Sequence, residues 1–258
     1  MIIKFYLFLY NLKNKFIKRA IASLLRHGIF IDNIQTIKLN DFLIRLNLSQ
    51  SIDREIFLKR VYEEGQLNFL KKISTEESFD YFFDIGANIG YYSLFLNHIK
   101  KIFAFEPNKT VFKNLKQNVE INNFNIAAYN FGVSDNNGSG QIWYNDKNKM
   151  SGSSILDVED KEIKKYNNNK IYKDQIETKI LDSFLKIEKS KILIKIDVER
   201  HESKVLDGMK LLLKNNKIFL QIEIHNELKD KILSKLDFLE FKFIQSIGID
   251  YYFKNYWI

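Results

Sequence analysis

Residues 79–108 read FDYFFDIGANIGYYSLFLNHIKKIFAFEPN, and this stretch decides the fold. It opens with an apolar run that carries Asp84 near its end and leads into a glycine-rich turn. A helix-like segment follows, and a second apolar run, Ile102–Phe105, ends in Glu106. Strand, tight turn, helix, strand and carboxylate in this order are typical of a nucleotide-binding βαβ unit. Glu106 lies 20 residues after Gly86, where a carboxylate is expected to bind the two hydroxyls of a ribose.

The turn differs from the dinucleotide pattern GxGxxG in the residues beside its glycines. Its spacing is D-x-G-x-N-x-G, formed by Asp84, Gly86, Asn88 and Gly90. A dinucleotide carries a pyrophosphate, which binds bare amides at a helix N-terminus. S-adenosylmethionine has no pyrophosphate but offers an amine, a carboxylate and a sulfonium, which suit an acidic and an amide side chain better. The turn therefore resembles motif I of S-adenosylmethionine-dependent methyltransferases, and a glycine turn that serves packing alone is the alternative.

Composition and charge narrow the class of protein. The 258 residues suffice for one α/β domain with a large core. Cysteine is absent, which excludes disulfides, thiolate zinc sites and a cysteine nucleophile, and fits a reducing compartment. The net charge is +8, but residues 1–30 hold six Lys and Arg residues and no acidic residue, so the rest is near balance. Nucleic acid is therefore not expected as a partner.

Residues 1–26 begin with a short apolar run and continue as a basic segment whose apolar side chains follow helical spacing. The run is too short to span a bilayer, and charged residues separate it from any cleavage site, so neither a membrane span nor a signal peptide is expected. Two interpretations remain. One is an amphipathic helix on an anionic membrane surface; the other, which we favour, is a helix packed on the main domain or on a second subunit.

The remaining chain alternates apolar runs with helix-like segments. We expect residues 1–78, with β-like runs at 28–46 and a helix at 51–73, to cap a domain at 79–258. Residues 146–179 have no clear period and are interpreted as a substrate lid over the ligand edge. Strands are expected at 81–85, 102–105, 125–131, 191–198, 218–224, 241–247 and 251–257, the last two as an antiparallel pair. This predicts the α/β fold of class I methyltransferases, a doubly wound, mostly parallel seven-stranded sheet with an N-terminal helical and β cap.

Polar side chains concentrate where two of the later strands end, at the edge at which open α/β sheets bind ligands. Alternation along a strand places residues 195, 197 and 199 on one face, and residues 223 and 225 on one face of the next strand. The residues are Lys195, Asp197, Glu199, His201 and Glu202 at one strand end, and Glu223 and His225 at the other.

Three interpretations of this cluster are open. A His between carboxylates suits a general base that takes the proton of a hydroxyl acceptor. The second interpretation is a network of salt bridges that stabilises the strand ends and has no catalytic role. A divalent metal is the third, and we predict none because the spacing selects no metal geometry. Its ligands would be Asp197, Glu199, His201, Glu223 and His225.

Six segments together resemble the FkbM-type methyltransferases over residues 40–225. They are DIGANIGYYSL at 84–94, AFEPN at 104–108, NFGVSD at 130–135, SGSS at 151–154, LDS at 181–183 and KIDVERHESKVLDGM at 195–209. The resemblance implies a class I S-adenosylmethionine-dependent O-methyltransferase, and the acceptors of that family are hydroxyls of sugars, surface glycans and secondary metabolites.

The resemblance also implies a role for each matching residue. The methionine part of the cofactor would lie against Asp84, Gly86, Asn88 and Gly90, the ribose against Glu106 with Asn108 in the same set, and the adenine near Val133, Ser134 and Asp135. The reaction centre would hold Asp197, Glu199, His201 and Glu202. Two positions depart from the family pattern: Arg200 stands where Gly is usual, and Lys109 where Pro is frequent.

We therefore expect an O-methyltransferase with S-adenosylmethionine as cofactor and a hydroxyl of a sugar, surface glycan or glycan precursor as acceptor. A non-catalytic glycan-binding or scaffold protein that keeps the fold is the alternative, suggested by Arg200 and the basic arm. The expected location is cytoplasmic, or the inner face of the cytoplasmic membrane if residues 1–26 contact lipid, and a homo-oligomer is a further expectation.

Overall fold

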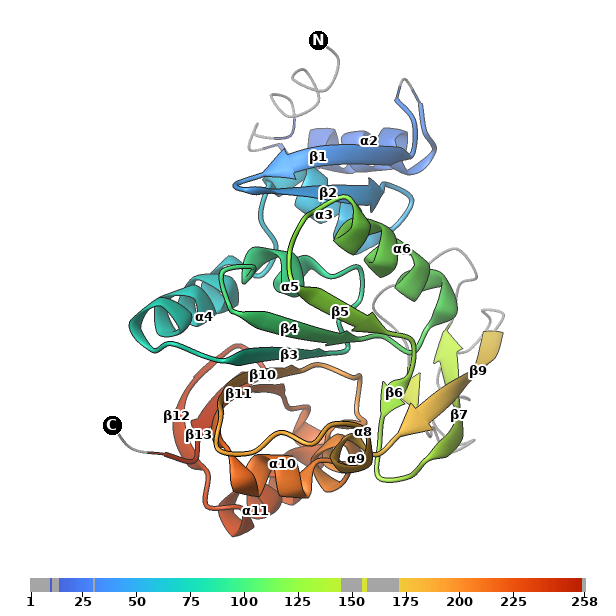
Figure 1. Ribbon diagram of the computed structural model, residues 1–258. Helices are drawn as coiled ribbons and strands as arrows, with labels where there is room; N and C mark the ends of the chain where they lie inside the picture. Colours follow the sequence, from blue (N-terminus) through green and yellow to red (C-terminus); the bar gives the residue numbers. More distant parts are fainter. Residues whose placement is uncertain (1–9, 11–13, 30, 145–154, 157–171, 257–258) are drawn as a thin grey trace.

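The computed structural model describes residues 10, 14–29, 31–144, 155–156 and 172–256. A seven-stranded sheet of order β12-β13-β11-β10-β3-β4-β5 forms its centre (Figure 1). The five strands from β11 to β5 are parallel, while β13 pairs antiparallel with β11 and β12 with β13. The strands are β3 Tyr81–Ile85, β4 Lys101–Phe105, β5 Ile126–Tyr129, β10 Lys191–Ile196, β11 Lys217–Glu223, β12 Lys242–Ile247 and β13 Asp250–Lys254. The predicted sheet and its closing antiparallel pair are confirmed.

Alternating side chains divide the core between the two faces of the sheet. On β3, Phe82 packs into one apolar cluster and Phe83 into the other, and both are fully buried. The first cluster includes residues of α4 (Glu64–Glu76), α5 (Tyr91–Phe95) and α6 (Lys109–Glu120). The second includes residues of α8 (Leu181–Phe184), α9 (Glu202–Asp207), α10 (Lys210–Asn215) and α11 (Lys229–Phe238), the last of which follows the 3-10 turn η1 (Asn226–Leu228). Burial of this apolar surface on both faces is the main stabilising contribution.

The N-terminal segment packs on the first face instead of forming a core of its own. The hairpin of β1 (Ile34–Leu39) and β2 (Phe42–Asn47) lies with α3 (Ser51–Lys59) and α2 (Lys15–Arg26) at one end of the molecule (Figure 1). Ile21 and Leu25 of α2 are 2% and 0% exposed and belong to the cluster that contains Phe82. One face of α2 thus packs on the protein, as favoured from the sequence, whereas membrane contact and a boundary at residue 78 stay predictions.

No described helix has the length and apolar character that a membrane span requires. The helix expected at 51–73 is wrong in one respect, because it is two helices, α3 and α4, separated by a turn. Arg60 and Glu63 take left-handed backbone conformations with φ of 63° and 49° there. The break turns Tyr62 and Glu63 toward the carboxyl ends of the strands, where both line a pocket.

The loop expected at 146–179 is wrong for its last residues. Tyr172–Lys179 form β9, which pairs antiparallel with β7 (Gly138–Tyr144) in a separate four-stranded sheet of order β6-β9-β7-β8. The other two strands are β6 (Gly132–Val133) and β8 (Ile155–Leu156). Ile176 and Thr178 alternate inward with exposed neighbours on β9, which is a strand pattern with few apolar residues. The proposed lid otherwise falls on residues 146–154 and 157–171, outside the described residues, as does the SGSS segment at 151–154.

Candidate active site

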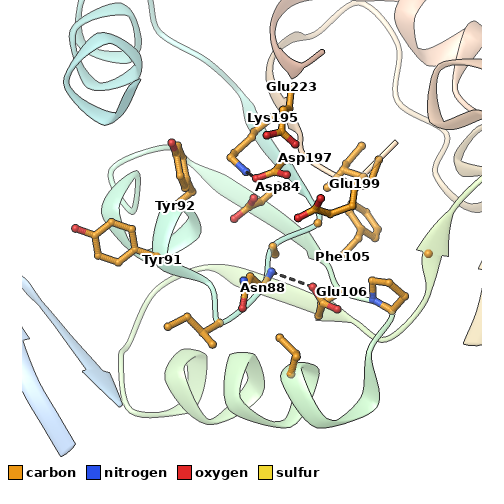
Figure 2. A pocket seen from close by; sticks show the side chains of 18 of the residues that line it. Asp84, Asn88, Tyr91, Tyr92, Phe105, Glu106, Lys195, Asp197, Glu199 and Glu223 are labelled. Atoms are coloured by element: carbon orange, nitrogen blue, oxygen red, sulfur yellow. Dashed lines mark hydrogen bonds and ion pairs between the residues drawn. The ribbon is translucent and has the colours of Figure 1, made fainter. Parts of the chain in front are cut away.

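A pocket of about 410 Å³ lies along the carboxyl ends of β3, β4, β10 and β11 (Figure 2). This is the edge at which the sequence predicts a ligand. Among the predicted site residues, those that line the pocket are Asp84, Gly86, Asn88, Glu106, Val133, Asp197 and Glu199. Those that do not line it are Gly90, Asn108, Ser134, Asp135, His201 and Glu202.

The glycine turn brings the ends of two strands into direct contact. Gly86 has a φ of 83°, and a Cβ built on it would lie 1.8 Å from the backbone oxygen of Asp197. Only glycine fits such a close approach in the left-handed region. Gly90 has a φ of 86°, and its Cβ would lie 2.6 Å from Leu115 Cδ1, so it closes the turn against α6. Gly86 therefore shapes the pocket floor without offering a side chain to a ligand, and Gly90 fixes the turn behind it.

Two buried side-chain oxygens on this turn have no hydrogen-bond partner. Asp84 accepts hydrogen bonds from the backbone N and the Oγ of Ser93 through Oδ2, at 3.1 and 2.6 Å. Its Oδ1 and the Oδ1 of Asn88 are buried and unpaired. Burial raises the pKa of the Asp84 carboxyl. Unpaired buried acceptors are rare in folded proteins, so these two oxygens are suited to a ligand that brings hydrogen-bond donors.

Glu106 is held at the end of β4 by two backbone amides. Its Oε2 accepts from the N–H of Asn88 at 3.0 Å and its Oε1 from the N–H of Asn108 at 2.8 Å. Asn108 itself caps α6, because its Oδ1 accepts from the backbone N–H of Thr110. Burial raises the pKa of the Glu106 carboxyl to about 7. Asn108 thus orients Glu106 from behind, while Glu106 borders the cavity.

Of the three residues expected near the adenine, Val133 lines the pocket, whereas Ser134 and Asp135 do not. Ser134 is 2% exposed, and its Oγ donates to Asp135 Oδ1 at 3.1 Å. A Cβ on Gly208 would lie 1.9 Å from the backbone oxygen of Ser134, so this loop packs closely on the turn after α9. Ser134 therefore joins two loops behind the pocket wall.

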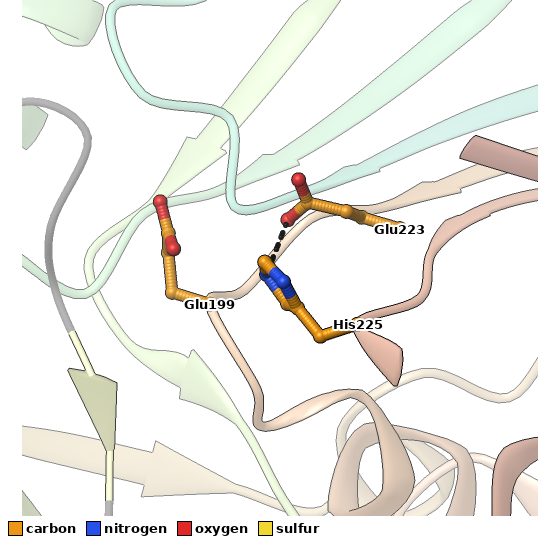
Figure 3. A group of neighbouring side chains, drawn as sticks. All are labelled: Glu199, Glu223 and His225. Atoms are coloured by element: carbon orange, nitrogen blue, oxygen red, sulfur yellow. Dashed lines mark ion pairs between the residues drawn. The ribbon is translucent and has the colours of Figure 1, made fainter. Parts of the chain in front are cut away.

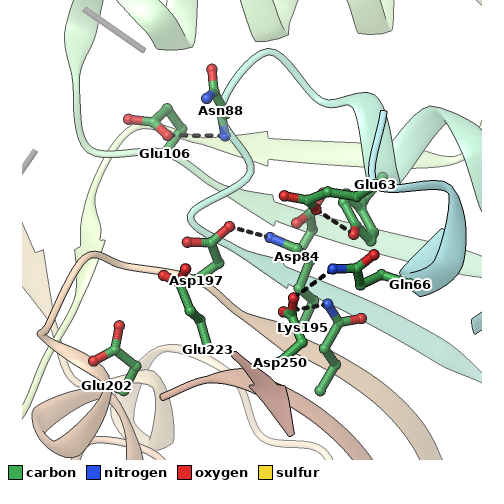
Figure 4. A network of polar contacts seen from close by, with 12 residues as sticks. Glu63, Gln66, Asp84, Asn88, Glu106, Lys195, Asp197, Glu202, Glu223 and Asp250 are labelled. Atoms are coloured by element: carbon green, nitrogen blue, oxygen red, sulfur yellow. Dashed lines mark hydrogen bonds and ion pairs between the residues drawn. The ribbon is translucent and has the colours of Figure 1, made fainter. Parts of the chain in front are cut away.

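An ion pair between the buried Lys195 and the partly exposed Asp197 lies at the centre of the strand ends (Figure 4). Lys195 Nζ is 2.8 Å from Asp197 Oδ2 and 4.6 Å from the centroid of the Tyr92 ring. Burial alone would lower the pKa of Lys195, but the carboxylates of Asp197, Asp84 and Glu63 raise it well above its ordinary value. Burial would likewise raise the pKa of Asp197, but Lys195 lowers it. Both residues are therefore charged, and Asp197 presents an ionised carboxylate to the pocket.

Glu199, Glu223 and His225 meet beside this pair (Figure 3). One ligand atom from each lies within 4.8 Å of the others. Burial, followed by the charge of Asp197, raises the pKa of Glu199 to about 7 and also raises that of Glu223. Glu199 and the next residue, Arg200, have φ values of 53° and 76°. That left-handed pair turns the chain after β10 and directs Glu199 into the group.

His201 and Glu202 lie behind the pocket, which corrects their expected place at its centre. His201 is 4% exposed, and its Nε2 is 2.9 Å from Ser134 Oγ. Glu202 is fully buried at the start of α9 and accepts from the backbone N–H of Arg200 at 3.0 Å. The left-handed turn ends the strand alternation before residue 201, so His225, not His201, is the imidazole beside the carboxylates.

Sequence reasoning missed the side of the pocket that the N-terminal segment supplies. Ser51, Ile52, Tyr62 and Glu63 line it, and Glu63 Oε2 accepts from the hydroxyl of Tyr92 at 2.6 Å. Burial raises the pKa of Glu63. Gly65, inside what reads as one long helix, was the only local signal of a break.

Comparison with known proteins identifies the family. The model of the methyltransferase FkbM domain matches residues 84–243, well over half of the chain. A hexuronic acid methyltransferase of Haloferax volcanii is 26% identical over 182 residues, which are 67% of this chain and 67% of that protein.

Two solved structures are distant matches. The FkbM methyltransferase of Methylobacillus flagellatus matches 67% of this chain and 43% of its own, at 16% identity and a TM-score of 0.46. The tRNA (uracil-54, C5)-methyltransferase of Pyrococcus abyssi, solved with S-adenosyl-L-homocysteine, matches 87% and 45%, at 11% identity and a TM-score of 0.46. The chain thus spans less than half the length of either. On the family match, which runs from the glycine turn through the last parallel strand, the chain belongs to the FkbM methyltransferase family.

Proposed function

We propose that this protein is an S-adenosylmethionine-dependent O-methyltransferase whose acceptor is a hydroxyl of a sugar, a glycan or a glycan precursor. The observation that carries the proposal is the pocket at the strand ends, with the unpaired Oδ1 atoms of Asp84 and Asn88 on residues that line it. Family membership supports methyl transfer, and the relative named as a hexuronic acid methyltransferase supports a carbohydrate acceptor.

The residues present fit the cofactor. Asp84 would accept hydrogen bonds from the methionine amine through its unpaired oxygen, and Glu106 would accept them from the ribose hydroxyls. Phe131, Val133 and Ile142 give the pocket an apolar wall that suits the adenine ring. Bound there, S-adenosylmethionine would supply an electrophilic methyl group on its sulfonium.

The carboxylates at the ends of β10 and β11 would act on the acceptor. Asp197, Glu199 and Glu223 line the same cavity, and Lys195 keeps Asp197 ionised. The three groups would hold the acceptor hydroxyl, and the ionised Asp197 would receive its proton as the oxygen attacks. Fixed orientation of donor and acceptor supplies a large part of the barrier reduction in such displacements, and a general base adds roughly 10²–10⁴-fold.

Incubation with S-adenosylmethionine that carries a trideuterated methyl group tests the proposal. The acceptor panel contains hexuronate oligosaccharides, neutral oligosaccharides and nucleotide sugars, and mass spectrometry with NMR locates the label. We expect label on a hydroxyl oxygen of at least one carbohydrate and a loss of transfer in Asp197→Asn. The exposed Glu120→Gln variant is the control. Label on nitrogen or on a carboxylate would contradict O-methylation of a hydroxyl, and bound cofactor without any transfer would favour the non-catalytic alternative.

A further inference from the structure

Three metal-ligating side chains converge at the pocket from two neighbouring strand ends. Glu199 follows β10, Glu223 ends β11 and His225 lies two residues beyond it (Figure 3). We propose that Glu199, Glu223 and His225 bind a divalent first-row metal ion such as Mn²⁺ at the acceptor side of the pocket. Of the five residues that the sequence offers as metal ligands, only these three meet as a group among the residues that the structure describes.

Glu223 and His225 do not form a close, hydrogen-bonded ion pair. Glu223 Oε2 and His225 Nε2 are 3.5 Å apart, beyond good hydrogen-bond distance, and both atoms are buried without a hydrogen-bond partner. Two neighbouring cations have carboxylate partners elsewhere, since Lys195 pairs with Asp197 at 2.8 Å and Arg200 with Glu227 at 2.9 Å. Buried polar atoms in native proteins are normally satisfied, and the Glu223 carboxyl also shares a hydrogen bond with Asp197. His225 Nε2 is therefore the atom for which an added cation would supply the missing partner.

The spacing of the ligand atoms fits a single ion. They lie within 4.8 Å of one another. Metal–ligand distances of about 2.0–2.3 Å put two ligands of one ion at most about 4.5 Å apart, so the group needs to contract by only a few tenths of an ångström. Two carboxylates and an imidazole form a mixed O/N set, which Mn²⁺, Fe²⁺ and Zn²⁺ accept, whereas Mg²⁺ and Ca²⁺ prefer oxygen ligands alone.

Open coordination positions would face the cavity, because Glu199 and Glu223 both line it. Three protein ligands leave room for further oxygen ligands on such an ion. Sugar hydroxyls would occupy these positions, and a hydroxyl bound to a cation releases its proton more readily. This use of the ion rests on the proposed function, whereas binding of the ion depends on the three side chains alone.

Titration of the full chain with MnCl₂, without cofactor, tests the site, and the electron paramagnetic resonance signal of free Mn²⁺ reports binding. We expect about one bound ion per chain and a rise in Tm with added metal. Because loss of groups that only orient a ligand already weakens metal affinity about 10–100-fold, Glu223→Gln and His225→Ala should weaken it by at least about that factor. The control variant Glu120→Gln, with a side chain 60% exposed on α6, should bind as the wild type does. Competition with Zn²⁺ and Mg²⁺ ranks the metals.

The proposal would be overturned if the wild-type chain leaves the signal of free Mn²⁺ unchanged and holds no metal ion that added Zn²⁺ displaces. This result does not depend on whether any variant folds. Unchanged Mn²⁺ affinity in both Glu223→Gln and His225→Ala would overturn it equally, and the pair would then be a structural ion pair. Calorimetry with S-adenosylmethionine on the same samples separates the two proposals. Cofactor binding without metal binding contradicts only the metal site, and metal binding without cofactor binding contradicts only the proposed cofactor.

Discussion

Replacement of Gly86 by alanine should damage the pocket and the fold together. The residue has a φ of 83°, and a left-handed residue with a Cβ costs about 1–2 kcal/mol. The new Cβ would also lie 1.8 Å from the backbone oxygen of Asp197, which cannot rotate away as a side chain would. Forced shifts of packed backbone add about 1–3 kcal/mol. We therefore expect Gly86→Ala to lower the free energy of unfolding by about 2–5 kcal/mol.

Urea unfolding followed by circular dichroism measures the change, and calorimetry with S-adenosylmethionine should show weakened binding, because the ends of β3 and β10 must separate. Gly65→Ala is the matched control. Its Cβ meets only Ile247 Cγ2 at an ordinary 3.5 Å, and its backbone is helical, so its stability should be equal or up to about 1 kcal/mol higher. If Gly86→Ala unfolds at the wild-type urea concentration and binds cofactor normally, the close approach to Asp197 does not exist and the reasoning is refuted.

Three further substitutions test other parts of the molecule by urea unfolding. Leu25→Ala should cost about 2–5 kcal/mol because Leu25 is fully buried, whereas Phe16→Ala on the same helix, 80% exposed, should cost almost nothing; equal losses would contradict the packing of α2. Burial raises the pKa of Asp53 from 3.8 to about 7, so the folded state keeps a proton that the unfolded state releases. Wild-type stability should therefore fall between about pH 4 and pH 7, by up to about 4 kcal/mol from this group, and Asp53→Asn should flatten that decline. Arg200→Gly relieves the left-handed φ of 76° but loses a partly exposed ion pair with Glu227. The net effect should be a rise in the free energy of unfolding of up to about 1 kcal/mol, and a marked decrease would contradict strain at this residue.

The sequence predicts those structural elements that are determined by residues close together in the chain. The unit from β3 to β4 contains its own strand, turn and helix, so the sequence alone assigns Asp84, Gly86 and Glu106 to one edge of the sheet. The order of the parallel strands follows from general rules of crossover connection, and the final antiparallel pair is marked by a turn at Gly248.

What the sequence could not predict depends on partners far along the chain or on unusual backbone. Strand β9 is polar on its exposed side and is defined by pairing with β7, whose residues lie 28 to 40 positions earlier, for example Gly140 with Ile176. The break between α3 and α4 relies on left-handed residues that are not glycine. His201 is expected at the reaction centre because it directly follows Asp197 and Glu199 and matches the family segment, but Glu199 and Arg200 turn the chain and place that ring against Ser134.

Binding of S-adenosylmethionine to the wild type and to Glu106→Gln, measured by calorimetry, tests most directly whether the strand-end pocket is a cofactor site. Glu106 is the carboxylate at the end of β4, and its two oxygens are already oriented by backbone amides. Above its raised pKa of about 7 the Glu106 carboxyl is charged, and loss of a charged acceptor costs about 1.5–3 kcal/mol, so at such a pH the variant should bind roughly 10–100-fold more weakly than the wild type while it stays folded. A folded wild-type protein that gives no binding heat, or a variant with unchanged affinity, would contradict the assignment.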